Sequence, residues 1–367
     1  LSAHWLREED HRPVGHAMTI SDETIKKAVQ RYQREYDRYL KLAARVADIC
    51  RSEIVEGNAI RAQVTSRAKG PKSFEGKLRR FAAAGKKSMP DVDAVFAQVR
   101  DLSAVRIATY EQRHEDQVVS LVARRFADAS GASPVPERKD KNLQDPGNFY
   151  RATHLEAFLR SADIVGTYAN VADVPCEIQV CSMMAHVWNE VEHDLGYKPA
   201  AGVLSHQERT FLTMLGQSVR MGDNTIQSLF AETERRQQEQ GGAFTDVYDF
   251  VARLRGWFPG VEDFGRHAGA LFEALLPMRL ASPDSIQKAI GLTGPLAAAG
   301  DQATREPMSM LGPNARFALD PGSSDLLLVL LLPKAATFLA KADPTTEGAA
   351  RVRWIAEQYL MSKAGDA

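Results

Sequence analysis

Cysteine is scarce in this sequence, and it contains no long uninterrupted apolar run. The three cysteines, Cys50, Cys176 and Cys181, lack the spacing of a zinc site and fit small buried residues in a reducing compartment. The most apolar segment, residues 325–340, is broken by a Pro-Lys pair and is too short for the roughly 20 residues of a membrane span. No basic and apolar signal segment opens the chain. We therefore expect a cytoplasmic protein with no membrane partner.

An excess of charge of either sign is also missing. The 46 Lys and Arg residues nearly balance the 47 Asp and Glu residues, and the formal net charge is −1. The bulk charge therefore gives no sign of a nucleic-acid or membrane partner, and local charge carries more information. The length of 367 residues and the 44% hydrophobic content suit a globular protein of two domains, or of one domain with a helical extension.

The residue pattern divides the chain into three parts. Residues 1–20 are polar and irregular, as in a disordered tail or a cloning remnant. Ser21 then begins a long amphipathic helix with two acidic residues in its first turn, where the helix dipole favours negative charge. Residues 21–240 form the first structured part. Residues 244–367, after the linker-like sequence RRQQEQGG, are expected to form a helical region whose role the sequence does not show.

Strand and helix patterns alternate between residues 60 and 240, which predicts an α/β (α+β) fold with a mixed sheet of about five strands flanked by helices. The expected strands cover residues 61–67, 103–110, 150–159 and 176–180. The expected helices cover residues 73–84, 115–127, 183 onward and 207–236. Residues 130–147, which are rich in Pro, Lys and Asp, are expected to form a polar loop.

A basic cluster lies where the first strand meets the next helix, and it contains Arg67, Lys69, Ser73 and Lys77. Free backbone N–H groups at a helix start favour an anion, and Lys77 lies on the same helix face as Ser73. The planar guanidinium of Arg67 can also stack on a base. Taken alone, this pattern fits a solvated basic helix as well as a cradle for a polyphosphate.

Charged side chains in two otherwise apolar strands indicate a polar cleft. Asp101 precedes one strand and Arg106 lies inside it, and alone these two also fit a structural ion pair. Glu177 and Gln179 share one face of another strand, because residues two apart point the same way. Asp101 and Glu177 together suit Mg²⁺, which prefers one or two protein carboxylates plus phosphate oxygens and water. A basic cradle beside such carboxylates indicates phosphate transfer between two nucleotides.

A third polar set, Tyr150, Arg151 and His154, opens a strand after the polar loop. The Tyr150 ring can stack on a second base, and the Arg151 guanidinium can meet the phosphates of that nucleotide. A single histidine is more often a structural residue than a catalyst, so both readings of His154 stay open.

These elements in this order resemble the synthetase domain of RelA/SpoT-type alarmone synthetases, a family that includes small alarmone synthetases and toxic relatives. The resemblance covers about residues 25–236 and implies a nucleotidyltransferase-like mixed sheet. It rests on Arg67, Lys69, Ser73 and Lys77, on Asp101, Arg106 and Ile107, on Tyr150, Arg151 and His154, on Glu177 and Gln179, and on Trp188, Glu192, His193, Tyr197 and Lys198.

The sequence departs from the family pattern at four positions. Ala104 and Phe149 stand where the family has glycine, and Cys181 and Ser182 replace an Arg-Thr pair. A bulky residue adopts a positive φ only at a cost, so Phe149 predicts an acceptor loop of a different shape. The missing arginine takes one positive charge from the expected cleft and leaves the identity of the acceptor open.

The resemblance implies an ATP-dependent pyrophosphokinase that transfers the β,γ-pyrophosphate of ATP to the 3′-hydroxyl of GDP or GTP, making the alarmone (p)ppGpp of the stringent response. The resemblance implies that Arg67 and Arg106 sandwich the adenine of ATP and that its phosphates are bound by Lys69, Ser73 and Lys77. It implies that Asp101 and Glu177 hold Mg²⁺ and that Glu177 accepts the hydroxyl proton. The acceptor nucleotide would be bound by Tyr150, Arg151, His154 and Gln179.

Two other functions remain open at this point. A toxin could use the same chemistry on tRNA 3′ ends or on adenine nucleotides, and surplus cations favour that reading, namely Lys72, Arg79, Arg80, Lys86 and Lys87. A nucleotide sensor without catalysis is the second, although a binding-only site has less need of the two carboxylates. The resemblance also implies outside control, by a regulatory partner, an antitoxin or the C-terminal region.

Overall fold

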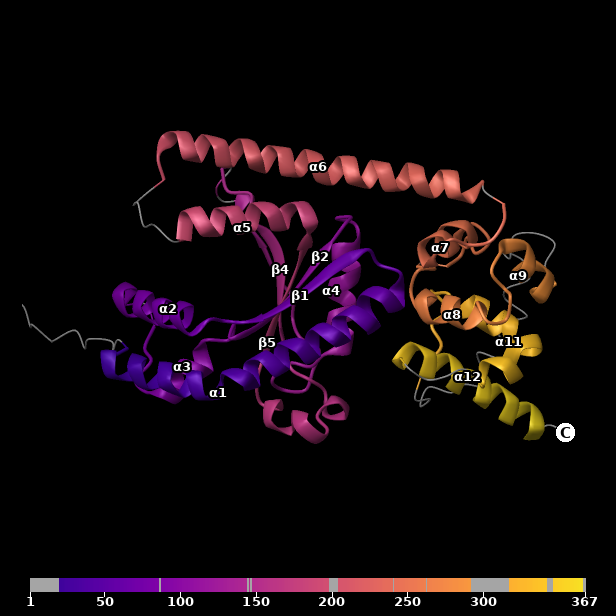
Figure 1. Ribbon diagram of the computed structural model, residues 1–367, viewed down its shortest axis with the longest axis horizontal. Coiled ribbons are helices and arrows are strands. Elements are labelled where there is room, and N and C mark those ends of the chain that lie inside the picture. The colour runs from indigo at the N-terminus through magenta and orange to yellow at the C-terminus, as the bar shows by residue number, and fades with distance from the viewer. Residues whose placement is uncertain are drawn as a thin grey trace, which may run out of the picture.

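The computed structural model describes residues 20–85, 87–143, 145, 147–197, 204–239, 241–261, 263–291, 317–341 and 346–365. A five-stranded sheet with its helices forms one part of the molecule, and a helical region forms the other (Figure 1). Each part has its own apolar core: the main core uses residues between 20 and 180, and the second begins at Phe244.

Helix α1, Asp22–Ile49, begins where the sequence predicts. The Ser21 side chain accepts a hydrogen bond from the backbone N–H of Thr24 at 3.0 Å and so caps the helix. Tyr32 and Tyr39 lie buried in the main core. The chain continues through a π-helical turn, Cys50–Val55, and a 3-10 turn, Glu56–Asn58.

The predicted tail, residues 1–20, includes one residue that belongs to the folded part of the chain. Residues 1–19 lie outside the described residues. Ile20 is buried and packs with the main core, so the prediction is wrong for this residue. An apolar residue just before a helix cap can pack against the helix, and this is the physical reason for the difference.

The sheet has the strand order β1-β2-β5-β4-β3. Its strands are β1 Ala62–Ala68, β2 Ser103–Thr109, β3 Glu137–Asp140, β4 Arg151–Ala157 and β5 Cys176–Ser182. Strands β2 and β5 run parallel, and the other neighbours run antiparallel. The predicted mixed sheet of about five strands is therefore confirmed.

Strand β3 corrects the prediction that residues 130–147 form only a loop. Its four residues, Glu-Arg-Lys-Asp, pair antiparallel with β4 at the edge of the sheet. Charged residues are well tolerated on an edge strand, so β3 shows none of the apolar alternation by which a strand is recognised.

The helices cover the two faces of the sheet differently. Their bounds are α2 Pro71–Ala84, α3 Val92–Gln98, α4 His114–Arg125, α5 Met183–Tyr197 and α6 His206–Gln238. Helix α3 was not predicted, because its seven residues are too few to show a period. Helices α1 and α4 pack on the apolar face, whereas α5 lies over the polar face with α6 outside it (Figure 1).

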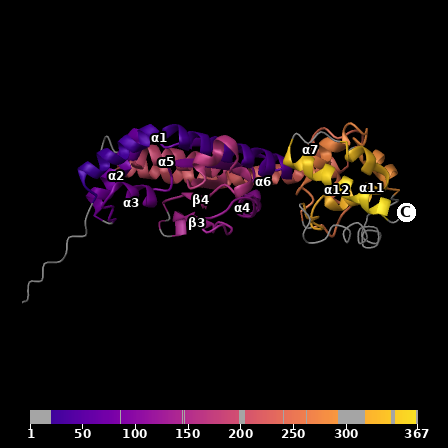
Figure 2. The same ribbon diagram turned by 90° about the horizontal axis from the view of Figure 1, so that it is seen from below.

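The C-terminal region is helical, as predicted (Figure 2). Its described helices are α7 Val247–Arg255, α8 Ala268–Leu275, α9 Pro283–Ile290, α11 Asp325–Leu339 and α12 Glu347–Gly365. The apolar run predicted to be buried forms α11, whose leucines lie in the second core. Across the described ranges, no helix has both the length and the apolar character that crossing a membrane requires.

Candidate functional site

The polar face of the sheet opens into two adjoining cavities that share Arg67. The larger, of about 320 Å³, lies at the β1–α2 junction and is lined by Arg67, Ala68, Lys69, Gly70, Lys72, Ser73, Gly76, Arg80 and His193. The smaller, of about 190 Å³, is lined by Thr65, Ser66, Arg67, Ala104, Val105, Arg106 and Gln179. The structure thus brings five of the predicted site residues to one cleft.

Arg67 differs from Arg106, which also lines the smaller cavity. Its side chain is exposed on β1, and among the described residues it has no hydrogen-bond or ion-pair partner. A guanidinium that is not already paired can meet a ligand without breaking a contact within the protein.

Two lysines converge on the Asp101 carboxylate, and one of them, Lys69, lines the larger cavity. Asp101 accepts from the Nζ atoms of Lys69 at 3.0 Å and Lys77 at 2.7 Å. Burial would raise the pKa of Asp101, but the charges of the two lysines outweigh it and hold the pKa below its ordinary value. Asp101 is therefore an ionised group that binds both lysines, of which Lys69 lines the cavity.

Helix α2 starts two residues earlier than predicted. Gly70 is its N-cap and Pro71 occupies the first helical position, where a missing N–H costs nothing. Ser73 is therefore the third residue of the helix rather than its start. It still lies in the first turn and lines the larger cavity, next to backbone N–H groups without helical partners.

Arg106 is held by residues of α5. Its Nη1 atom lies 2.8 Å from Glu190 Oε1 and 3.0 Å from His186 Nδ1, and Nη2 donates to Gln179 Oε1 at 3.4 Å. The structural pair between Arg106 and Asp101 that the sequence left open is therefore wrong. His186 and Glu190, four residues apart on one helix face, were missed, because their sequence pattern does not show which face of α5 meets the sheet.

Glu177 lies at the centre of a hydrogen-bond chain on the cleft face. Its Oε1 atom lies 3.0 Å from His154 Nδ1, and Oε2 accepts from Gln179 Nε2 at 2.6 Å. Burial opposes ionisation, but His154 and Gln179 outweigh it and lower the pKa of Glu177. The hydroxyl of Tyr150 meets the other ring nitrogen of His154 at 2.8 Å. Glu177, Gln179, His154 and Tyr150 thus form one connected chain.

Tyr150 itself is partly buried at the entry to β4. Lys141 Nζ lies over its ring, 4.7 Å from the centroid, and burial raises the pKa of its hydroxyl to about 12. The phenol therefore stays protonated near neutral pH and holds His154 in place.

Comparison with known proteins identifies this part of the chain. Residues 66–201 match a family model described as the region found in RelA / SpoT proteins. We call residues 66–201 the RelA/SpoT region after this match. All eleven predicted site residues lie inside the RelA/SpoT region, between Arg67 and Gln179. Among curated proteins, none matches the chain.

Three solved structures illustrate what the fold is similar to. The small alarmone synthetase 1 from Bacillus subtilis is 18% identical with a TM-score of 0.44, over 56% of this chain and 99% of that one. The same synthetase bound to its product pppGpp is 19% identical with a TM-score of 0.43, over 55% and 98%. A GTP pyrophosphokinase family protein from Streptococcus pneumoniae is 16% identical with a TM-score of 0.44, over 56% and 96%.

Arg151 of the RelA/SpoT region does not lie in the cleft, which corrects the role expected for it. Strand alternation turns Arg151 to the face opposite His154. There its guanidinium contacts Glu115 of α4 at 2.9 Å and Asp223 of α6 at 3.3 Å. Ser182, one of the departures from the family pattern, donates to the same Asp223 at 2.9 Å. Arg151 is therefore part of a buried ionic cluster that ties β4 to two helices.

The buried cluster around Arg151 should make the free energy of unfolding depend on pH. Burial raises the pKa of Glu115 to about 7, although Arg151 opposes the shift. The folded protein then holds a proton that the unfolded chain releases near pH 4.5, so stability falls as pH rises from about 4.5 to about 7. We expect Glu115→Gln to remove about 2 kcal/mol of this decline in the free energy of unfolding, measured in urea between pH 5 and 8. Asp116→Asn, at an exposed neighbour, is the control, and parallel curves for wild type and Glu115→Gln would refute this origin.

The backbone at Phe149, in the RelA/SpoT region, does not have a positive φ. The glycine that the family has at this position had suggested that it would. The positive-φ non-glycine residues of the described chain are Ala59, His267 and Arg279. The Phe149 ring instead lies beside Trp188, with centroids 6.2 Å apart, and fills a notch at Gly216 of α6. A Cβ atom at Gly216 would come within 2.2 Å of the Phe149 ring. Phe149 therefore packs the loop before β4 against α5 and α6.

Because the Phe149 ring fills the notch at Gly216, a larger residue at position 216 should destabilise the fold. Gly216→Ala should lower the free energy of unfolding by about 1–3 kcal/mol, because the new methyl overlaps a ring packed against Trp188 and α6. Gly222→Ala should cost less, since its Cβ would meet the flexible end of Met184. Phe149→Ala added to Gly216→Ala should recover part of the loss in a double-mutant cycle. Additive effects would show that the ring and the notch do not interact.

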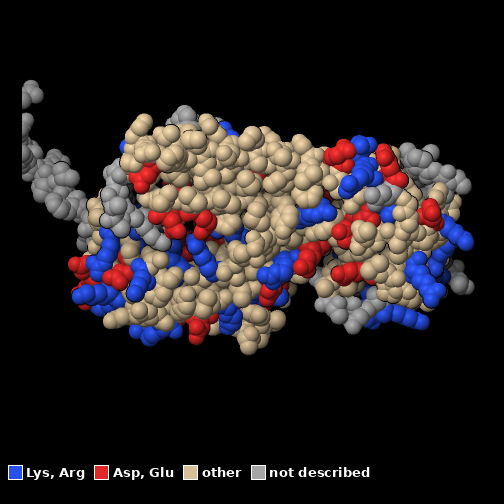
Figure 3. Space-filling model, turned by 45° about the horizontal axis from the view of Figure 1, so that its top comes forward, with Lys and Arg blue, Asp and Glu red and all other residues tan. Residues whose placement is uncertain are grey.

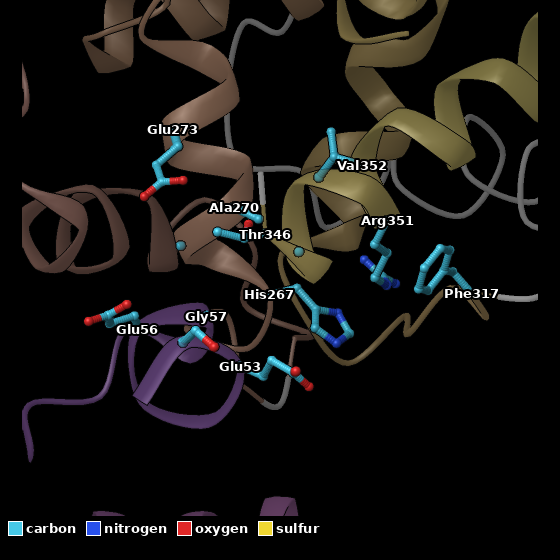
Figure 4. Close-up of a pocket in the computed structure, with 13 residues that line it drawn as sticks. Glu53, Glu56, Gly57, His267, Ala270, Glu273, Phe317, Thr346, Arg351 and Val352 are labelled. Carbon is cyan, nitrogen blue, oxygen red and sulfur yellow. The ribbon is translucent and has the colours of Figure 1, made fainter. Parts of the chain in front are cut away.

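A further cavity, of about 210 Å³, lies where the C-terminal region meets the turns after α1 (Figure 4). Glu53 and Gly57 line one side, and His267 and Arg351 line the other. The Arg351 guanidinium donates to buried Asp325 at 2.7 Å, so the positive charge of this cavity is already neutralised. Arg351 differs in this respect from Arg67, which has no ion-pair partner among the described residues.

Proposed function

We propose that the cleft transfers the β,γ-pyrophosphate of ATP to a nucleotide 3′-hydroxyl, with GDP or GTP as the acceptor. The observation that carries this proposal is the arrangement of two ionised carboxylates, Asp101 and Glu177, beside a basic cavity that joins a second cavity at Arg67. The RelA/SpoT match over residues 66–201 supports the same reaction class.

ATP would occupy both cavities. Its triphosphate fits the larger one, where Lys69, Ser73 and the first-turn N–H groups of α2 offer positive charge and donors. Its adenine fits the smaller one, between the guanidinium groups of Arg67 and Arg106. Glu190 and His186 fix the plane of Arg106 and so help to set the base position. Arg67 sits at the junction of the two cavities and can contact both parts of ATP.

The residues of the cleft fit Mg²⁺ by their chemistry. Asp101 binds Lys69 of the larger cavity and Glu177 binds Gln179 of the smaller one, so both carboxylates lie beside the two adjoining cavities. In the described part of the chain, no group of three or more His, Cys, Asp or Glu residues forms a metal site alone. An ion held by Asp101 and Glu177 would thus complete its shell with phosphate oxygens and water, as Mg²⁺ does, and would neutralise phosphate charge.

Lys69 and Lys77 change partners in this scheme. Both lysines donate to Asp101 in the structure. When the triphosphate arrives, its oxygens compete for these ammonium groups, which frees oxygens of Asp101. The lysines then offset the charge that builds on the bridging oxygen between the α- and β-phosphates as AMP leaves.

Glu177 would take the proton of the attacking hydroxyl. It is ionised near neutral pH because its pKa is lowered, and His154 and Gln179 hold its two oxygens in fixed directions. The 3′-oxygen forms a bond to the β-phosphorus, the α–β bridge breaks, and AMP leaves with the bridging oxygen. Most of the acceleration in such a site comes from alignment and electrostatics.

An acceptor screen tests the proposed function. ATP labelled in the β- and γ-phosphates is incubated with the protein and GDP, GTP, AMP or tRNA, and the label is followed by chromatography. We expect label on the guanine nucleotides. Label only on tRNA would favour the toxin reading, for which Lys72 and Arg80 at the cavity rim supply charge. ATP binding without transfer to any acceptor would favour a nucleotide sensor.

A further inference from the structure

Helix α6 carries few charges along its middle. Between residues 210 and 231 it has two charged residues, Arg220 and Asp223. Figure 3 shows a broad area over α5 and α6 that is almost free of Lys, Arg, Asp and Glu. Asp223 belongs to the buried cluster around Arg151. Arg220 has no ion-pair partner among the described residues, so its contacts are of another kind.

The Arg220 guanidinium joins the two ends of the loop before β4. Its Nη2 atom donates to Asn142 Oδ1 at 2.7 Å, in the 3-10 turn Lys141–Leu143 that follows β3. Its Cζ atom lies 4.8 Å from the centroid of the Phe149 ring. A planar guanidinium can stack on a ring and donate a hydrogen bond in its own plane at the same time. One side chain of α6 thus holds residues 142 and 149 together.

Two neighbouring positions of α6 contact the same loop. Thr213 and Gly216 precede Arg220 by seven and four residues, which places all three on one face of the helix. A Cβ atom at Gly147 would lie 3.7 Å from Thr213 Oγ1, and the Phe149 ring fills the notch at Gly216. This face of α6 therefore lies against residues 147–149, and Arg220 extends the contact to residue 142.

The ends of the loop adjoin side chains expected to bind the acceptor. Tyr150 directly follows Phe149, and Lys141 directly precedes Asn142. The Lys141 Nζ atom lies over the Tyr150 ring, and the Lys141 backbone N–H donates to the Tyr150 carbonyl at 3.0 Å. A shift of either loop end would therefore move the ring that is expected to stack on the acceptor base.

We propose that Arg220 is a positioning residue for the acceptor, because it holds the loop, and with it the Tyr150 ring, through Asn142 and Phe149. Phe149 stands where the family has glycine, so the stacking half of this contact is a feature of this chain. Arg220 lines neither of the cavities proposed for ATP, and its loss should leave ATP binding unchanged. The effect on the acceptor rests on the proposed function, whereas the hold on the loop can be measured without any ligand.

Hydrogen exchange followed by mass spectrometry measures the loop in the ligand-free, full-length protein. The Asn148 amide donates to the Asp145 carbonyl, and the Tyr150 amide donates to the Asn148 side chain. We expect these amides to exchange at least about fivefold faster in Arg220→Ala, because the loop opens more often once its ends are released. Arg235→Ala is the matched control, since this exposed arginine of α6 pairs with two glutamates of the same helix. Equal exchange in Arg220→Ala and wild type would overturn the proposal.

Calorimetry with GDP and, separately, with ATP distinguishes the acceptor from the donor. We expect Arg220→Ala to bind GDP about tenfold more weakly and to bind ATP within about twofold of wild type. Arg220→Lys should lose about threefold for GDP, because one ammonium group can donate to Asn142 or lie over the Phe149 ring but cannot do both. Asn142→Ala should add little to the loss in Arg220→Ala, since the two side chains form one contact.

The outcomes for Arg220 and for the proposed reaction are separable. Weaker ATP binding by Arg220→Ala, or GDP binding equal to that of wild type, would overturn the positioning role of Arg220. If wild type binds no GDP, the proposed function fails instead, and the exchange rates alone decide about the loop. Faster exchange in Arg220→Ala would then still support its hold on the loop, and unchanged exchange would refute it.

Discussion

Glu177→Gln is expected to lower the rate of pyrophosphate transfer by about 10³-fold while changing the dissociation constant for ATP by less than about threefold. The substitution keeps the size of the side chain but removes both the proton acceptor and one of the two negative charges proposed for Mg²⁺. Glu177 lies on the sheet between His154 and Gln179, outside the cavities proposed to hold the phosphates and adenine. Rates come from single turnover, and ATP affinity comes from calorimetry.

Glu156→Gln is the matched control for this experiment. Glu156 pairs with Glu177 in the β4–β5 register and shares its sheet face, but its side chain is 41% exposed and contacts Arg100. It should keep the wild-type rate within about twofold. If Glu177→Gln transfers at the wild-type rate, Glu177 is not the proton acceptor. If it loses ATP binding as well, its role is structural.

Arg67→Ala, unlike Glu177→Gln, is expected to act mainly on ATP affinity, with ATP binding roughly 100-fold weaker. Arg67 lines both cavities and has no ion-pair partner among the described residues, so its guanidinium is available to the ligand. Loss of base stacking and of a charged hydrogen bond to phosphate together corresponds to about 2–4 kcal/mol. The stability of the fold should hardly change, because Arg67 is exposed.

Arg79→Ala provides the comparison for Arg67. Arg79 is also an exposed arginine close to the β1–α2 junction, but it pairs with Glu75 of α2 and Asp22 of α1 and is not among the residues that line the two cavities. Its removal takes away the same charge without touching either cavity, so ATP affinity should stay within about twofold. Equal losses for the two variants would mean that only the overall positive charge matters and that Arg67 has no specific place in the site.

Much of the cleft was predictable from sequence because its residues lie on regular elements. The cap at Ser21, the cleft face shared by Glu177 and Gln179, and the convergence of Arg67 with Lys69 follow from helix capping and strand alternation. Strand alternation alone would also have predicted that Arg151 points away from the cleft, since a residue three positions from His154 in a strand must point to the other face.

The features that sequence could not supply depend on contacts between distant segments. Whether His186 and Glu190 meet Arg106 depends on how α5 rotates over the sheet, which local periodicity leaves undetermined. Phe149 looked like a strained replacement for glycine, but the glycine that accommodates it is Gly216, 67 positions later on α6. Strand β3 is charged throughout, so only its pairing with β4 reveals it.

The most direct test of the central claim is the identity of the nucleotide left after transfer. ATP and GDP are incubated with the protein and Mg²⁺, and all products are quantified by mass spectrometry. The account predicts AMP in a one-to-one ratio with a guanine nucleotide that has gained two phosphates at its 3′ position. ADP formed together with a singly phosphorylated acceptor, or AMP that appears equally with and without any acceptor, would contradict it.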